Sequence, residues 1–158
     1  MKWTTAIFAL ATATGAFAAP TAEIVEDRAA TVTCRPTLNG QIKPFRVDLG
    51  TAQSEARRVG LAPGKSGDPH RYFNGDGIHW GVQNCDKPGA ILLEYPIYQI
   101  GKNAQWQKDT LTSAQKGGPT PLRTVFANAN GGVVFCGVMT HSQVNAQNQG
   151  LSHFSHCT

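Results

Sequence analysis

The sequence predicts an α+β domain in which one α-helix packs on a central antiparallel β-sheet with large structured loops. Three observations support this class. One stretch has helical periodicity, several short β-prone runs are separated by turn signals, and four cysteines follow a predicted signal peptide. The 158 residues are enough for one domain and not comfortably for two.

An N-terminal β-hairpin followed by a helix is expected at the start of this domain. The β-prone runs Thr31–Cys34 and Phe45–Leu49 lie on either side of Leu38–Gln41, which contains an Asn-Gly turn signal. Apolar residues in Thr51–Val59 then recur at i, i+4 and i+7, which predicts an amphipathic helix. Gly60 follows the last of them and is a suitable helix stop.

The second half of the chain is expected to form the sheet. Leu61–Gly77 is rich in Gly, Pro and Asp and is therefore predicted to be a loop. The strand candidates after it are Ile78–Val82, Ala90–Pro96, Arg123–Asn128 and Val133–His141. A tight Asn-Gly-Gly turn joins the last two. Between the middle two lies a long basic loop, Gly101–Pro121, and a loop of such length in a compact domain is usually functional.

The N-terminus is expected to be removed in two cuts. Residues 1–18 have a short basic start, an apolar run rich in small residues and a small-x-small end, as in a secretory signal peptide. Residues 19–28 are acidic and end in Arg28, which indicates a propeptide, so that residues 29–158 form the single mature domain. A membrane anchor and a simple disordered tail are the alternatives for these two segments.

The cysteines and the charge agree with a secreted protein that binds polyanions. Cys34, Cys85, Cys136 and Cys157 predict two disulfides, for which the sequence alone allows three pairings. A zinc site is the competing interpretation, although there is no CxxC spacing. The formal net charge of +4 favours partners such as RNA or acidic lipid without specifying either.

Strand alternation predicts that charged side chains from neighbouring strands gather on one sheet face. Glu94, Arg123 and His141 each share a face with an apolar residue two positions away on the same strand. His70 would be brought to them by its loop, which Pro69 rigidifies. A sheet face carrying these groups is costly to bury without a purpose. The alternative is a buried ion pair with histidines that take no part in chemistry.

Four segments in order carry a family resemblance. They are Asp68–Asp76 (DPHRYFNGD), Leu92–Ile97 (LLEYPI), Leu122–Phe126 (LRTVF) and Val134–His141 (VFCGVMTH). They resemble the motifs of the fungal guanyl-preferring ribonucleases and their ribotoxin branch, most of all the hirsutellin-like insecticidal kind. The resemblance runs from about Ala29 to the C-terminus.

This resemblance implies a catalytic set and its roles. Glu94 would be the general base for the ribose 2′-OH, and His141 the general acid for the departing 5′-oxygen, through a 2′,3′-cyclic phosphate. His70 would hydrogen-bond the 2′-OH and Glu94, steadying the carboxylate or replacing it as base. Arg123 would face the phosphate oxygens. No metal or other cofactor is implied, because the internal 2′-OH is a nucleophile already in place.

The resemblance also implies substrate contacts and the disulfide pairing. The residues implied to contact substrate are Asp68, Tyr72, Asn74, Asp76, Phe126 and Phe154. Ordinary turn residues and plain core aromatics are the alternatives for several of these. The disulfides would join Cys34 to Cys157 and Cys85 to Cys136. The larger ribotoxins have a tyrosine where this chain has Asp68, which puts the share of His70 in catalysis in doubt. A metal cluster formed by His153 and His156 is a further, weaker alternative.

Three functions remain open on the sequence. The first is a secreted, monomeric ribotoxin that cuts the sarcin–ricin loop of large-subunit rRNA, binds the ribosome through its basic loop and contacts anionic membrane surfaces. The second is an extracellular guanyl-preferring ribonuclease without ribosome specificity. The third is a non-enzymatic effector or binding module on the same fold.

Overall fold

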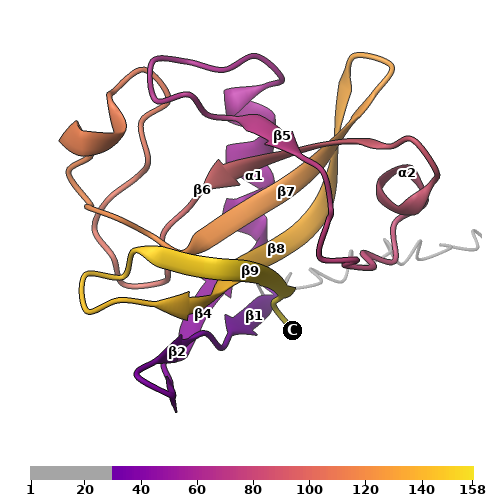
Figure 1. Cartoon of the computed structure of the whole chain (residues 1–158). Coiled ribbons are helices and arrows are strands. Elements are labelled where there is room, and N and C mark those ends of the chain that lie inside the picture. The colour runs from indigo at the N-terminus through magenta and orange to yellow at the C-terminus, as the bar shows by residue number, and fades with distance from the viewer. Residues whose placement is uncertain (1–29) are drawn as a thin grey trace, which may run out of the picture.

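The structure is a computed structural model that describes residues 30–158 (Figure 1). The predicted signal peptide and propeptide therefore lie outside the described residues. The elements in chain order are β1 (Thr31–Cys34), β2 (Thr37–Leu38), β3 (Gln41–Ile42), β4 (Phe45–Asp48), α1 (Leu49–Val59), β5 (His70–Tyr72), α2 (Gln83–Asp86), β6 (Ile91–Pro96), the 3-10 turn η1 (Thr112–Ala114), β7 (Leu122–Ala129), β8 (Gly132–Val144) and β9 (Gly150–His156). No helix in this part of the chain is long and apolar enough to cross a membrane.

A seven-stranded sheet forms the centre of the domain and α1 covers one of its faces. The strand order is β3-β2-β8-β7-β6-β5, and β9 pairs with β8. All pairings are antiparallel except the short contact of β2 with β8. In Figure 1, α1 lies behind the sheet and the loops gather around its rim. The predicted α+β fold is confirmed.

The N-terminal hairpin is nested. β1 pairs with β4 in a separate two-stranded sheet, and the strands between them in the sequence, β2 and β3, pair with each other at the edge of the seven-stranded sheet. The inner turn is the Asn-Gly pair named above, and both residues have positive φ, 51° for Asn39 and 78° for Gly40. A two-residue turn of this kind matches the twist of the strands that it joins.

Helix α1 begins at Leu49, two residues before its predicted start at Thr51. The reason is the cap: the Asp48 side chain accepts a hydrogen bond of 2.6 Å from the backbone N–H of Thr51. The face predicted to be apolar is the buried one, with Ala52, Ala56 and Val59 turned to the core.

The expectation of a strand at Ile78–Val82 is wrong. The N–H groups of Trp80, Gly81 and Val82 instead donate to the carboxylate of Asp86 at 2.8–3.2 Å, so this segment wraps the start of α2. Conversely, β5 lies within the segment predicted to be a loop, and β9 was not predicted at all.

Two separate cores lie on the two sides of the sheet. The side of α1 holds Leu93, Tyr95, Leu122, Phe126 and Val138, packed against the helix. The other side holds Tyr72, Trp80, Leu92, Val125, Ala127 and Met139. The disulfides are Cys34–Cys157 and Cys85–Cys136, the pairing that the resemblance implies. The first joins β1 to the C-terminus, and the second ties α2 to β8.

Replacing both Cys34 and Cys157 by serine should lower the free energy of unfolding by roughly 3–5 kcal/mol, because the bond closes a long loop in the unfolded chain. Its sequence separation is 123 residues. Denaturant unfolding of the oxidised protein and of the variant measures the difference. A loss below about 1 kcal/mol would contradict a stabilisation of this origin.

Candidate active site

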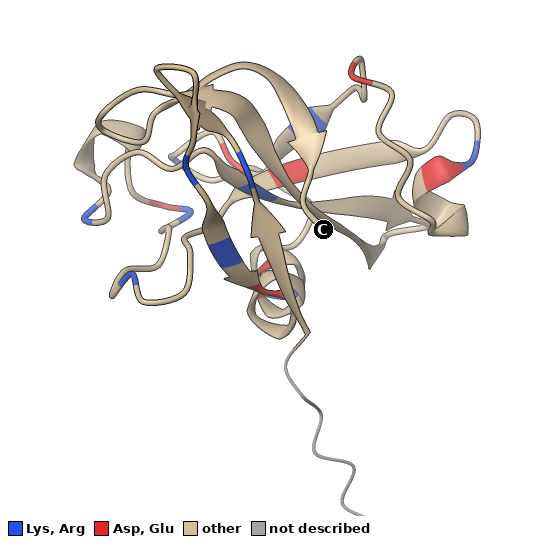
Figure 2. Cartoon of the chain, turned by 90° about the horizontal axis from the view of Figure 1, so that it is seen from below, with Lys and Arg blue, Asp and Glu red and all other residues tan. Residues whose placement is uncertain are grey.

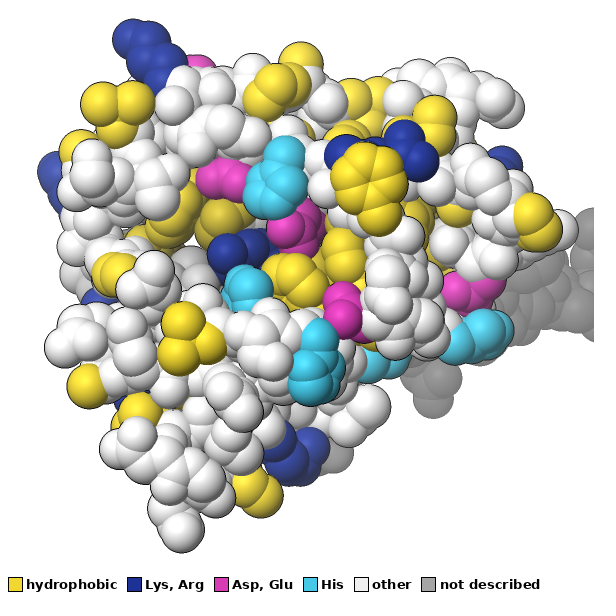
Figure 3. All heavy atoms as spheres, viewed as in Figure 1, with side chains coloured by type: hydrophobic (Ala, Val, Ile, Leu, Met, Phe, Trp, Pro, Cys, Tyr) yellow, Lys and Arg dark blue, Asp and Glu magenta, His cyan; other side chains and the backbone are white. Residues whose placement is uncertain are grey.

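The sheet face opposite α1 carries the charged side chains. Glu94 on β6 lies across from Val125 on β7, and Arg123 on β7 lies across from Met139 on β8. His141 follows on β8, where it pairs with Phe154 of β9. The predicted common face is therefore present. Figure 3, seen from the side opposite α1, shows a hollow in which acidic, basic and histidine side chains gather over apolar ones.

His70 stands between two carboxylates. It belongs to the short strand β5 and pairs with Glu94 in the antiparallel ladder, so a strand brings it to the site rather than a loop. Its Nδ1 lies 2.9 Å from Oδ1 of Asp68, and its Nε2 lies 2.5 Å from Oε1 of Glu94. These two partners raise the pKa of His70 to about 9, with the hydrogen bond to Asp68 as the largest cause. At neutral pH His70 is thus an imidazolium ion.

Two buried polar atoms at the centre of the site have no hydrogen-bond partner among the described residues. They are Oε2 of Glu94 and Nε of Arg123. The other end of the Arg123 guanidinium is fixed, since Nη1 donates to the carbonyls of Thr120 and Leu122 at 2.8 and 2.9 Å. Burial lowers the pKa of Arg123, and the nearby carboxylates of Glu94 and Asp68 oppose this. Unsatisfied buried atoms are rare, and two of them on charged groups of the same sheet face indicate a site that a ligand completes.

The ring of His141 is held on three sides. Its Nδ1 lies 3.0 Å from the carbonyl oxygen of Ser152, to which it donates, and its ring packs on Phe154 at a centroid distance of 4.1 Å. Gly150 adjoins the ring so closely that a Cβ there would overlap it. Burial lowers the pKa of His141, and the positive charge of Arg123 adds to this effect. Nε2 is left as the atom that can exchange a proton with a ligand.

A second group of polar side chains lies at the end of β5 and on the loop that follows it. The hydroxyl of Tyr72 is 3.1 Å from Oδ1 of Asn74 and 3.2 Å from Oδ2 of Asp76. Asn74 has a positive φ of 50° and bonds the backbone of Ile78 in both directions, at 2.8 Å each. Burial raises the pKa of Tyr72, with Asp76 adding to it, so its hydroxyl stays protonated. These contacts fix the shape of the loop and leave it beside the catalytic face.

Two residues implied to contact substrate are placed elsewhere. Phe126 is fully buried in the core on the α1 side, because it alternates with Val125 and Ala127, whose side chains face the other way. RNA cannot reach it, so we leave it out of the site. Asp68 is 6% exposed and contacts His70 and Trp106, so its place is behind the histidine.

Comparison with known proteins identifies the family. A family model described as ribonuclease matches residues 39–158. The chain belongs to the ribonuclease family. The solution structure of hirsutellin A from Hirsutella thompsonii is 64% identical, with a TM-score of 0.73, and the match covers 81% of this chain and 98% of that one. Restrictocin, a ribotoxin from Aspergillus, matches at 24% identity with a TM-score of 0.62 over 82% of this chain and 99% of that one, which shows a common fold. A search of curated protein sequences gives no match.

The chain is thus a member of the ribonuclease family that is similar to hirsutellin A, and it is an RNA-cleaving endoribonuclease. The sequence predicted both. Within residues 30–158, no group of three or more His, Cys, Asp or Glu side chains is arranged to hold a metal ion. His153 is exposed and bonds the hydroxyls of Ser142 and Ser152, whereas the ring of His156 packs on Trp80.

Sequence reasoning missed two contributors to this ribonuclease site. Trp106 donates its indole N–H to Asp68, 38 positions away, and no local pattern indicates such a contact. Gly150 makes room for His141 from a strand that was not predicted. The signal available for the second was the glycine itself, since an isolated glycine in a strand often marks a close approach.

Replacing Gly150 by alanine should reduce RNA cleavage at least about tenfold, because the added methyl group displaces the His141 ring by a fraction of an ångström or more. Gly150 pairs with Val144 in the ladder and its φ is not in the left-handed region, so the backbone tolerates alanine. Steady-state cleavage of a guanylyl dinucleotide measures the effect. Wild-type turnover in a folded variant would contradict this role of the close approach.

The stability of the ribonuclease should depend on pH through His70. Its pKa in the folded state, about 9, lies above the ordinary histidine value of 6.5. The stabilisation is therefore fully present below pH 6.5 and is lost as the pH rises through 9. Denaturant unfolding of the wild type should show a fall in the free energy of unfolding over this window, and His70→Gln should lack that fall. Parallel curves for the two proteins would refute the charged state of His70.

Proposed function

We propose that the protein is a secreted ribotoxin that cleaves one phosphodiester bond in the sarcin–ricin loop of large-subunit rRNA and thereby stops translation. The observation that carries the proposal is that Glu94 Oε2 and Arg123 Nε have no hydrogen-bond partner within residues 30–158 and lie on the same sheet face as His141. Cleavage by an internal 2′-hydroxyl requires a base, an acid and a cationic hydrogen-bond donor that stabilises the phosphate.

In the first step, Oε2 of Glu94 takes the proton from the 2′-OH of the ribose. The 2′-oxygen forms a bond to phosphorus while the bond to the 5′-oxygen breaks, and Nε2 of His141 gives that oxygen its proton. Arg123 stabilises the charge that develops on the phosphate oxygens. The product is a 2′,3′-cyclic phosphate. In its hydrolysis the two roles reverse, with His141 accepting a proton from water and Glu94 returning one to the 2′-oxygen.

His70 acts in this mechanism as a fixed cation. Both of its nitrogens are occupied by carboxylates, so it has no free nitrogen with which to accept a proton. Of the two roles that the resemblance implied, steadying Glu94 fits this arrangement and replacing it as base does not. By holding Oε1, His70 leaves Oε2 of Glu94 as the basic atom.

The base before the cleaved bond is proposed to be guanine, bound by the loop after β5. Asp76 has a carboxylate that can accept hydrogen bonds from two N–H groups of guanine, and the hydroxyl of Tyr72, which also contacts Asn74, holds it in place. Phe154 lines the phosphate site beside His141. Ribosome contacts are assigned to the Gly101–Pro121 loop, which carries Lys102, Lys108 and Lys116. In Figure 2, the basic positions are spread over several loops and strands.

Glu94→Gln and His141→Gln should each lower turnover of a guanylyl dinucleotide by about 10²–10⁴-fold and leave the fold unchanged, since each removes one proton-transfer group. His79→Gln is the matched control, because His79 is an exposed histidine whose side chain is 82% accessible and lies outside the site. Near-native turnover by either site variant, with circular dichroism like that of the wild type, would disprove the assigned roles.

Incubation with intact ribosomes and, separately, with naked RNA tests the choice of target. A ribotoxin should release a single discrete fragment from large-subunit rRNA at enzyme concentrations that leave most other RNA intact. General degradation of both samples would instead favour an extracellular guanyl-preferring ribonuclease, and cleavage of neither would favour a binding module. Binding to vesicles containing anionic lipid tests the proposed membrane contact, and should weaken as salt is added.

A further inference from the structure

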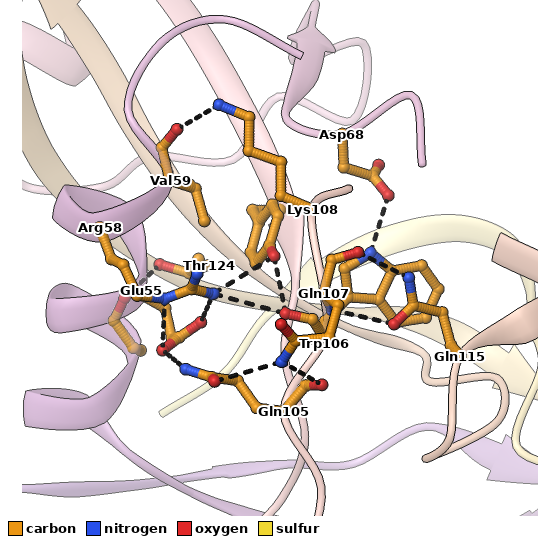
Figure 4. Close-up of polar contacts among 12 residues, drawn as sticks. Glu55, Arg58, Val59, Asp68, Gln105, Trp106, Gln107, Lys108, Gln115 and Thr124 are labelled. Carbon is orange, nitrogen blue, oxygen red and sulfur yellow. Dashed lines mark hydrogen bonds and ion pairs between the residues drawn. The ribbon is translucent and has the colours of Figure 1, made fainter. Parts of the chain in front are cut away.

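A hydrogen-bonded cluster behind the catalytic face joins the long basic loop, α1 and Asp68 (Figure 4). We propose that Trp106 in this cluster is a positioning residue for RNA cleavage: its indole N–H fixes the carboxylate of Asp68, and through it His70. The inference rests on the proposed function of His70 and Glu94 and adds a residue to it. It assigns the Gly101–Pro121 loop a part in the catalytic geometry in addition to contact with the target.

The Trp106 indole and the Asp68 carboxylate are in direct contact. Nε1 of Trp106 donates to Oδ2 of Asp68 at 3.1 Å, and the other oxygen of that carboxylate faces Nδ1 of His70 at 2.9 Å. Both Trp106 and Asp68 are almost fully buried, at 5% and 6% exposure. Each carboxylate oxygen therefore has one partner, and a rotation of the carboxylate would break both bonds in a place that water does not fill freely.

The backbone of Trp106 is held by α1 and β6. Its carbonyl accepts hydrogen bonds from the hydroxyl of Tyr95 at 2.8 Å and from Nη2 of Arg58 at 3.4 Å. Arg58 is in turn paired with Glu55 at 2.6 Å, and Glu55 also accepts from the Gln105 side chain. The residue before the tryptophan and the tryptophan itself are thus both bound to the helix network.

The chain after Trp106 is held by side-chain hydrogen bonds as well. Gln115 accepts from the backbone N–H of Gln107 at 2.9 Å and donates to the carbonyl of Gln107 at 2.7 Å and to that of Thr110 at 2.8 Å. Nζ of Lys108 donates to the carbonyl of Val59, at the end of α1, at 2.7 Å. The indole therefore projects from a segment fixed on both sides, which makes it a rigid support for Asp68.

Trp106→Phe tests the proposal, because it removes the N–H donor and keeps an aromatic ring. The matched control is Trp80→Phe, since Trp80 is equally buried and its Nε1 has no hydrogen-bond partner among the described residues. With guanylyl-3′,5′-adenosine as substrate, Trp106→Phe should lower kcat about 10–100-fold with little change in KM, as expected for misplacement of a reacting group. Trp80→Phe should retain wild-type kcat.

The double variant with Asp68→Asn separates positioning from general loss of packing. If Trp106 acts through Asp68, then Trp106→Phe should change kcat by less than about twofold once Asp68 is replaced. The pKa of His70, followed by NMR, should fall from about 9 towards 6.5 in Trp106→Phe and stay in place in Trp80→Phe. An unchanged kcat and His70 titration in folded Trp106→Phe, or additive effects in the double variant, would overturn the proposal.

If Trp106→Phe does not fold, a measurement on the wild-type protein tests the positioning role of Trp106 instead. The indole N–H resonance of Trp106 should shift with the same midpoint as the titration of His70, because both bind one carboxylate. If the chemical shift of the indole N–H did not change as His70 titrates, the proposal would be overturned. The NMR readout needs no turnover, so its failure is distinguishable from failure of the proposed function, which would appear as a wild-type protein that does not cleave RNA.

Discussion

The chain of contacts from Asp68 through His70 to Glu94 governs the rest of the active site. Two buried carboxylates, one on β6 and one just before β5, repel each other and lose their hydration, which is tolerable only if a cation lies between them. The imidazole supplies that cation, and its pKa of about 9 shows how strongly the two carboxylates favour the charged form. One protonated ring therefore makes it possible to place Glu94 in a buried site as an anion.

The contact between His70 and Glu94 also helps to give the catalytic groups different roles. One oxygen of Glu94 is bound by His70, and the other has no partner in the part of the chain that the structure describes, so the second oxygen is the natural proton acceptor. His141 lies in a different environment, where burial and the charge of Arg123 lower its pKa. Two histidines on one sheet are thus driven apart, one towards a permanent cation and the other towards a group that gains and loses a proton. Environments that push pKa values in opposite directions are how a single fold assigns acid and base roles.

Much of this arrangement could be predicted from the sequence. Two-residue alternation along β6, β7 and β8 places Glu94, Arg123 and His141 on one face, and the structure shows them there. The same alternation, carried one residue further, puts Phe126 in the opposite core, which the motif comparison alone overlooked. Strand β5 was not predicted because it has only three residues and lies in a segment rich in glycine and proline, where a two-residue alternation of apolar and polar side chains cannot be recognised. The contact of Trp106 with Asp68 depends on how two loops fold against each other, and no local signal records it.

The charge of His70 is the central claim, and ¹⁵N NMR of its imidazole in the wild-type protein at pH 7.5 tests it most directly. We expect both ring nitrogens to be protonated, with chemical shifts typical of imidazolium and both N–H protons protected from exchange by their carboxylate partners. A neutral ring, with one nitrogen shifted to the unprotonated position, would contradict the account. His70 would then be able to accept the proton from the 2′-hydroxyl, and the role of sole base assigned to Glu94 would be lost.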